Sequence, residues 1–119
     1  MKRPGQIALL RLAQTVLAPG KLRPVLLLRR ASSRFDDWLV CMVTSRLHQA
    51  EPDLDEPILP TDPDFADTGL KAPSMARLSR LAVVEGATLA GALGAVAPAR
   101  LQRMRQRLAR WILQEPPLS

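Results

Sequence analysis

The stretch KLRPVLLLRR, residues 21–30, decides the fold. Its five central residues, Pro24 to Leu28, are apolar and a pair of arginines closes the run, which predicts a β-strand with one or both faces buried. Pro24 has no N–H to donate to a sheet, and it forces the residue before it into an extended conformation. Arg23 therefore opens the strand at its rim. It is either a flanking charge that keeps the strand soluble or a fixed cation that can stabilise an anion.

The composition predicts one domain over residues 1–119. Of the 119 residues, 47% are hydrophobic and 24% are charged, which suits a globular chain with a single core. Lys and Arg number 17 against 11 Asp and Glu, and all of these cations except Lys2, Lys21 and Lys71 are arginines. The planar guanidinium favours phosphate and carboxylate groups. A nucleic acid or an acidic protein is therefore the expected partner.

The composition also disfavours several classes of protein. With two Trp, two Phe and no Tyr, the chain lacks the stacking platforms of an aromatic single-strand binder. Its one cysteine, Cys41, lies in an apolar run and, like Trp38, is expected in the core, so neither a disulfide framework nor a thiolate metal site is predicted. No apolar run has transmembrane length and no signal-peptide pattern is present. We therefore expect a cytoplasmic protein without membrane contact, metal or cofactor.

Apolar runs on both sides of the central strand predict a mainly β fold. Residues 5–12 and 37–45 are the expected neighbouring strands, and turn chemistry at residues 18–21 suggests an antiparallel meander. Residues 75–85 are partly apolar on both faces, which favours a central strand. Residues 88–96 predict a turn followed by a short last strand, because two glycines weaken a helix there.

Residues 98–114 have the clearest helical pattern. Pro98 suits a first turn. Apolar residues recur at helical spacing on one face, with Trp111 as the expected anchor onto the sheet: Leu101, Met104, Leu108, Trp111 and Ile112.

Residues 51–67 differ from the rest of the chain. Seven of the eleven acidic residues lie here, interleaved with four prolines, which excludes a long helix or a central strand. We expect an extended connection with a short edge strand near Ile58 and Leu59. Asp62, Asp64 and Asp67 do not have the spacing of an EF-hand loop, so a solvated acidic loop is predicted rather than a calcium site.

Four fragments, in order, resemble a known family. They are Gly5-Gln6-Ile7, Gly20-Lys21-Leu22-Arg23-Pro24-Val25-Leu26, Val43-Thr44-Ser45 and Thr68-Gly69-Leu70-Lys71-Ala72-Pro73-Ser74. With Ala92-Leu93-Gly94-Ala95-Val96 and the terminal helix, the chain resembles the MazF/PemK toxins of type II toxin–antitoxin systems over residues 4–113. The resemblance implies an α+β, mainly β fold: a small antiparallel SH3-like barrel of the MazF/PemK/CcdB kind with a C-terminal α-helix.

The same resemblance implies an activity and partners. It implies a homodimer with metal-independent endoribonuclease activity on single-stranded RNA. It also implies that a cognate acidic antitoxin blocks this activity, and that operator DNA is contacted only through the antitoxin. The four arginines of the predicted helix then form either a solvated surface or one facing RNA or the antitoxin: Arg100, Arg103, Arg107 and Arg110.

The resemblance also assigns site residues. In the family, the arginine of an RP motif and the threonine of a TS motif form the catalytic pair, which corresponds to Arg23 and Thr44 here. Substrate contacts are expected from Ser45, Lys21, Gly69, Lys71, Ser74 and Arg77. Plain solvent exposure is the alternative for Lys71, Ser74 and Arg77, and Gly69 most simply serves a turn that needs positive φ. The chain departs from the family at Gln6, where an aspartate commonly follows the glycine.

The chemistry of RNA cleavage fits these residue types. The 2′-hydroxyl of RNA can attack its own phosphorus and leave a cyclic phosphate and a 5′-hydroxyl, so that positioning, charge stabilisation and proton transfer suffice. Arg23 can bind the phosphorane oxygens, and Thr44 can hydrogen-bond one of them. The general base is open: His48 lies four residues after Thr44, and Asp36 or Asp37 could approach from the preceding loop.

Two other functions compete with the ribonuclease. One is a non-catalytic toxin that binds a protein target, as the related gyrase poisons do, and the other is a plain nucleic-acid-binding barrel. An intact pair of Arg23 and Thr44 favours the ribonuclease, because a binding module does not need that pairing.

Overall fold

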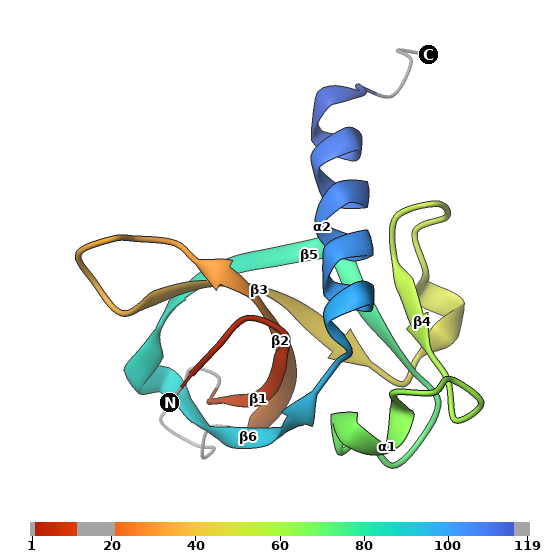
Figure 1. Cartoon of the computed structure of the whole chain (residues 1–119), viewed down its shortest axis with the longest axis horizontal. Helices are drawn as coiled ribbons and strands as arrows, with labels where there is room; N and C mark the ends of the chain where they lie inside the picture. Colours follow the sequence, from red (N-terminus) through yellow and green to blue (C-terminus); the bar gives the residue numbers. More distant parts are fainter. Residues whose placement is uncertain (1, 12–20, 116–119) are drawn as a thin grey trace.

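The predicted apolar strands form one six-stranded antiparallel sheet (Figure 1). The computed structural model describes residues 2–11 and 21–115. The strands are β1 (Gln6–Arg11), β2 (Leu22–Arg30), β3 (Asp37–Thr44), β4 (Glu56–Ile58), β5 (Ser74–Glu85) and β6 (Leu89–Ala95), in the order β4-β5-β3-β2-β1-β6. The predicted meander of β1, β2 and β3 is confirmed. The predicted turn at residues 18–21 lies outside the described residues, apart from Lys21.

The fold is α+β and mainly β, as predicted. The sheet curves strongly around the core (Figure 1), and β4 and β6 are the two ends of its strand order, so the expected barrel is a coiled open sheet. Short 3-10 turns η1 (Leu47–Gln49) and η2 (Gly86–Thr88) and the one-turn helix α1 (Phe65–Thr68) connect strands. Helix α2 (Pro98–Leu113) follows the last strand, also as predicted.

Apolar side chains of β2 serve two cores, because successive residues point to opposite faces. Leu26 and Leu28 join a helix-side core that includes Met104 and Leu108 of α2. Val25 and its alternate neighbours join a far-side core on the other face: Ala8, Leu10, Val25, Leu27, Trp38 and Val40. Both faces of the central strand are thus buried, and so are Trp38 and Cys41, as predicted. Burial raises the pKa of the Cys41 thiol to about 12.

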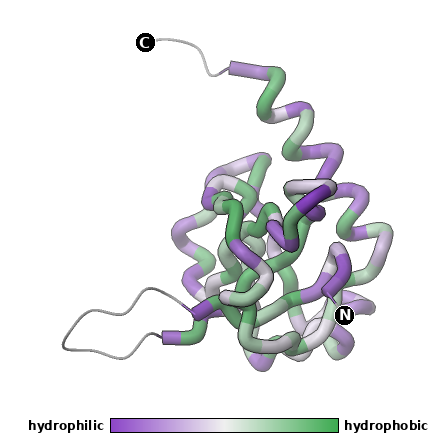
Figure 2. The backbone as a smooth tube through the Cα atoms, turned by 90° about the vertical axis from the view of Figure 1, so that its left-hand side faces the viewer, coloured by the Kyte–Doolittle hydropathy of each residue, from purple (hydrophilic) through white to green (hydrophobic). Residues whose placement is uncertain are grey.

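The end of α2 differs from the prediction. Met104 and Leu108 are buried, but Trp111 is 45% exposed and does not anchor the helix. Trp111 follows Leu108 on the apolar side of the helix, but the C-terminal part of α2 extends past the sheet (Figures 1 and 2). Its last turn therefore leaves Trp111, Ile112 and Leu113 at the surface.

Two glycines let α1 and β6 approach each other closely. Gly69 follows α1 with φ +74°, which confirms the predicted turn with positive φ. A Cβ on Gly69 would lie 2.2 Å from the Leu93 carbonyl oxygen, and one on Gly94 would lie 2.1 Å from the Asp67 carbonyl oxygen. The two backbones can only meet because both positions lack a side chain.

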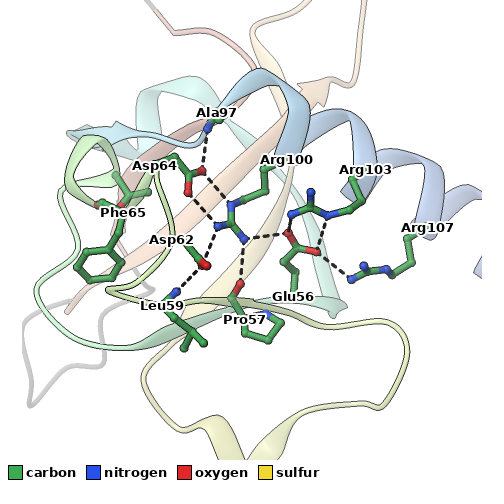
Figure 3. Close-up of polar contacts among 11 residues, drawn as sticks. Glu56, Pro57, Leu59, Asp62, Asp64, Phe65, Ala97, Arg100, Arg103 and Arg107 are labelled. Atoms are coloured by element: carbon green, nitrogen blue, oxygen red, sulfur yellow. Dashed lines mark hydrogen bonds and ion pairs between the residues drawn. The ribbon is translucent and has the colours of Figure 1, made fainter.

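The prediction of a solvated acidic loop holds for Asp67, which is exposed, but is wrong for Asp64 and for much of the segment before it. The short edge strand exists as β4, but Asp55, Glu56 and Asp64 are buried. A buried carboxylate needs a counter-charge or several hydrogen bonds. Residues far away in the sequence supply both the counter-charges and the hydrogen bonds. Figure 3 shows the contacts between the acidic segment and the arginines of α2.

Arg100, in the first turn of α2, neutralises three carboxylates of the acidic segment, Glu56, Asp62 and Asp64. We call this set the Arg100 ion-pair cluster (Figure 3). Nε and Nη2 donate to the two oxygens of Asp64, each at 2.9 Å. Nη1 donates to Glu56 at 2.9 Å and Nη2 to Asp62 at 2.8 Å. Only 8% of the Arg100 side chain is exposed. The cluster therefore fastens the start of α2 to the acidic segment.

Neither alternative for the helix arginines describes them well. Arg103 and Arg107 both donate to Glu56, and Arg105 donates to the Leu28 carbonyl. Of the four arginines predicted to be solvated or to face a partner, Arg110 is exposed and in no ion pair within the described part of the chain. Most of this arginine-rich surface holds the fold together.

Candidate functional site

The register of the sheet places the ends of three strands together. Val25 of β2 pairs with Met42 of β3, and continuing this register by two residues sets Arg23 opposite Thr44. Met42 also pairs with Arg77 of β5. Because side chains alternate along strands, Arg23, Thr44 and Arg77 stand on the face of the sheet that carries the far-side core.

These three residues line one open groove with a volume of about 710 Å³. Among the residues that the structure describes, the groove lining has five cations and neither a carboxylate nor an imidazole: Arg23, Arg46, Lys71, Arg77 and Arg80. Its hydroxyl and amide groups come from Thr44, Ser45, Ser74 and Gln49. Such a lining suits a chain of phosphates, which arginine and lysine bind with charge-assisted hydrogen bonds.

The groove brings together most of the residues predicted to form the site. Both members of the predicted pair line it, as do four expected substrate contacts: Ser45, Lys71, Ser74 and Arg77. Lys21 and Gly69 do not line it. Lys21 is exposed just before β2, and Gly69 packs against β6 two residues before Lys71.

The local contacts of Arg23 and Thr44 leave donor groups of both side chains available to a ligand. Thr44 Oγ1 accepts a hydrogen bond from the Arg46 N–H at 3.1 Å, so the O–H of Thr44 is free to donate. Arg23 is exposed and forms no ion pair with the residues that the structure describes. Ser74 differs, because its hydroxyl donates to the Ala72 carbonyl at 2.8 Å.

Three residues of the groove were not predicted from the sequence: Arg46, Gln49 and Arg80. Arg46 directly follows the TS motif, so its position next to two predicted site residues could have indicated that it lines the groove. Gln49 lies in η1, after a change of chain direction that the sequence does not reveal. Arg80 faces the groove only because β5 is irregular, a feature without a turn signature in the sequence.

The candidate general bases lie outside the groove. His48 is exposed in η1 and does not line it. Asp37 begins β3 and Thr44 ends it, so roughly 24 Å of strand separates them. Asp36 instead binds Trp38 Nε1 at 2.8 Å and Lys2 Nζ at 3.1 Å, and the Trp38 hydrogen bond in particular holds the pKa of Asp36 below its usual value. The expectation that Asp36 or Asp37 approaches Thr44 is therefore wrong.

Residues 2–11 and 21–115 contain neither a metal-binding cluster nor a membrane-spanning helix. No group of three or more His, Cys, Asp or Glu side chains there is arranged to hold a metal ion. Neither described helix has the length and apolar character needed to cross a membrane.

Comparisons with known proteins point to one family. A family model described as PemK-like, MazF-like toxin of type II toxin–antitoxin system matches residues 3–112. No curated protein matches the chain in sequence.

Solved structures share the fold at low identity. An endoribonuclease in complex with its cognate antitoxin, from a mycobacterial species, is 18% identical with a TM-score of 0.68, over 98% of this chain and 100% of that one. The Mycobacterium tuberculosis toxin MazF-mt6 is 18% identical with a TM-score of 0.66, over 93% and 99%. An endoribonuclease from a mycobacterial species is 19% identical with a TM-score of 0.63, over 95% and 92%. At these identities the likeness concerns the fold.

Proposed function

Because the chain belongs to the family of PemK-like, MazF-like toxins of type II toxin–antitoxin systems, we propose that it is an endoribonuclease that cleaves single-stranded RNA without a metal ion. The observation that carries the proposal is the cationic groove with Arg23 and Thr44 side by side in the strand register. Solved structures of similar fold described as endoribonucleases support it. Activity on messenger RNA would make the cytoplasm its place of action.

In the proposed reaction the RNA supplies its own nucleophile. The 2′-oxygen attacks the adjacent phosphorus, a P–O2′ bond forms and the P–O5′ bond breaks. The 2′-hydroxyl loses a proton and the 5′-oxygen gains one, which leaves a 2′,3′-cyclic phosphate and a 5′-hydroxyl. No oxidant, metal or protein nucleophile is required, so the protein contributes positioning and charge stabilisation.

Each member of the pair has a role that suits its contacts. Arg23, exposed at the groove rim, binds two non-bridging oxygens of the pentacoordinate phosphorus with its guanidinium fork. It cannot carry the proton, because a guanidinium stays protonated. Thr44 donates its free O–H to the same phosphorus group. The described residues that line the groove include neither a carboxylate nor an imidazole, so we assign proton removal to solvent.

Substitutions of the pair test the proposal. Arg23→Ala is expected to slow cleavage of single-stranded RNA by about a hundred- to a thousand-fold, the usual cost of losing one preorganised donor. Arg23→Lys should restore little, since an ammonium lacks the two-point fork. Thr44→Ala should also be severe, whereas Thr44→Ser keeps the hydroxyl and part of the rate.

The assay includes a chelator and identifies both product ends. Arg110→Ala is the matched control, because it removes an exposed arginine far along α2 and should leave the rate unchanged. A requirement for added metal, or full activity in Arg23→Ala, would contradict the mechanism. A folded, antitoxin-free wild type that cleaves no RNA would favour the non-catalytic toxin that binds a protein target. The groove lining also suits that function, because it holds no carboxylate or imidazole among residues 2–11 and 21–115.

Two partners complete the proposal. An acidic antitoxin segment would bind along the same five cations and so exclude RNA. We also propose a homodimer at micromolar concentration, in agreement with the exposed apolar residues at the end of α2. Light scattering measures this directly, and a monomer at every concentration would contradict it.

A further inference from the structure

Strand β5 carries a three-residue bulge next to the groove. Cys41 and Met42 are consecutive on β3, but their partners on β5, Leu81 and Arg77, are four residues apart. The intervening residues, 78–80, therefore have no ladder partner on β3. Bulges of this kind commonly lie beside active sites, where they redirect side chains.

The bulge reverses which face each residue of β5 occupies. Ala76 before the bulge and Leu78 at its start belong to the helix-side core, whereas Ala82 and Val84 after it pack against the far-side core. Even-numbered residues have thus changed faces. Arg77 precedes the change and Arg80 follows it, and both line the groove although they are three residues apart. In a regular strand these two side chains would point in opposite directions.

The side chain of Asp55 is fully buried and binds the centre of the bulge. Its Oδ1 accepts the Ser79 N–H at 3.0 Å and the Ser79 hydroxyl at 2.9 Å. Oδ2 accepts the Glu51 N–H at 2.8 Å. Asp55 thereby supplies the acceptor that the interrupted ladder does not give to Ser79.

The same carboxylate faces Arg77. Arg77 Nε lies 3.7 Å from Asp55 Oδ2, close enough for an ion pair but too far for a hydrogen bond, and this Nε is buried without an acceptor among the described residues. The two terminal nitrogens of Arg77 donate to the side chain and carbonyl of Gln49, at 3.4 and 3.1 Å. Asp55 therefore holds the guanidinium from behind while Gln49 holds it on the groove side.

We propose that Asp55 is a positioning residue, whose buried carboxylate shapes the β5 bulge so that Arg77 and Arg80 together bind the RNA backbone in the groove. The inference rests on the proposed function for its ligand, and on the strand register and contacts for its geometry. Asp55 does not line the groove and acts only through the two arginines.

Steady-state kinetics of Asp55→Asn test this role. The asparagine side chain has only one oxygen that can accept hydrogen bonds, and it places no negative charge next to Arg77. We expect KM to rise about tenfold with kcat changed less than about twofold, because phosphate contacts made equally in substrate and transition state affect KM. The salt dependence of binding to uncleavable RNA should also weaken, by about 0.7 in the slope for each phosphate that the variant no longer binds.

Two comparisons separate positioning from general damage. Asp53→Asn is the matched control, because Asp53 is exposed, and its φ of +65° is one that asparagine tolerates. It should leave KM and the slope unchanged. In an Arg77→Ala/Arg80→Ala background, Asp55→Asn should add no further change in KM, since residues that act through one another are not additive. A full additional tenfold rise there would overturn the proposal.

An NMR measurement distinguishes this proposal from the proposed function. The Nε–H signal of Arg77 should move in Asp55→Asn and stay in place in Asp53→Asn. If the wild type cleaves RNA but Asp55→Asn, folded, keeps its KM, salt slope and Arg77 signal, the positioning role fails and the ribonuclease stands. If the signal moves but neither the wild type nor any variant binds or cleaves RNA, the proposed ribonuclease function is refuted, while the positioning of Arg77 by Asp55 stands.

Discussion

Gly94 shows what one missing side chain does at a crossing of two backbones. Its neighbours across the crossing are the carbonyl groups of Asp67 and Thr68, and backbone atoms cannot rotate out of the way. Gly94→Ala should therefore lower the free energy of unfolding by about 1–3 kcal/mol, as overpacked sites generally do. Urea unfolding measures the change. Ala90→Ser, at an exposed position of β6, is the control and should stay within about 0.5 kcal/mol.

His48 provides a second test at the scale of one residue. It is exposed in η1 and outside the groove, so His48→Gln should leave the rate of RNA cleavage within about twofold of the wild type at every pH. The rate of the wild type should rise with pH without a histidine inflection, because solvent takes the proton. A bell-shaped profile that disappears in His48→Gln would show that the imidazole reaches the substrate.

The sequence predicted the neighbourhood of Arg23 and Thr44 but not the partners of Arg100. The first follows from one rule, that the start of a strand meets the end of its antiparallel neighbour. The second joins residues 36 and 44 positions apart, and no local pattern encodes such pairs. One signal was nevertheless present: Arg100 precedes the buried Met104 by four residues, so it shares its helical face and needed counter-charges.

At the scale of elements, the Arg100 ion-pair cluster decides how α2 is held. Arg100→Met keeps the length of the side chain but leaves buried carboxylates without their cation, which typically costs about 3–5 kcal/mol. Arg103 is half exposed, so Arg103→Ala should cost at most about 1 kcal/mol. Arg110→Ala should change little. Urea unfolding of the three variants should follow this order, and a loss under about 1 kcal/mol for Arg100→Met would contradict the role of the cluster.

The same cluster makes the free energy of unfolding depend on pH in the acidic range. Hydrogen bonds from Arg100 hold the pKa of Asp64 at about 2, below its ordinary value of 3.8. A carboxyl whose folded pKa is depressed stabilises the fold fully above its unfolded pKa, and this stabilisation disappears as pH falls through the folded value. We expect a loss of about 2 kcal/mol between pH 4 and pH 2 from this group. The loss should shrink in Asp64→Asn and persist in Asp53→Asn, as urea titrations at several pH values would show.

Elements were easier to predict than their irregularities. Apolar runs and helical spacing indicated β1, β2, β3, β5, β6 and α2, because burial of an apolar face dictates those periods. The β5 bulge reverses the alternation without a glycine or proline to mark it, so Arg80 could not be placed. The prediction that Trp111 anchors α2 was wrong for a different reason. The apolar face of the helix was predicted correctly, but the helix sequence does not reveal how far the sheet extends beneath it.

For the whole molecule, charge is concentrated where it can act on a polyanion. The formal net charge is +6, and five cations line the groove, while Glu56, Asp62 and Asp64 are engaged with arginines elsewhere. With about three to five phosphate contacts, the logarithm of the affinity for uncleavable single-stranded RNA should fall with the logarithm of salt with a slope of about −2 to −3.5. Arg46→Ala should reduce the slope by about 0.7 and Arg110→Ala should not. A flat dependence would indicate a protein target.

The Arg100 ion-pair cluster also has a consequence for the ribosome that makes the chain. The six strands that the structure describes are synthesised before α2. Glu56, Asp62 and Asp64 therefore emerge without their cation, and the helix-side core emerges without Met104 and Leu108. We expect the nascent chain to remain inactive until α2 has emerged, which would spare the translation apparatus during its own synthesis. Stalled nascent chains that end at residue 97, joined to a C-terminal spacer long enough to clear the ribosome exit tunnel, should be cut by protease within residues 45–64, where released full-length chains resist.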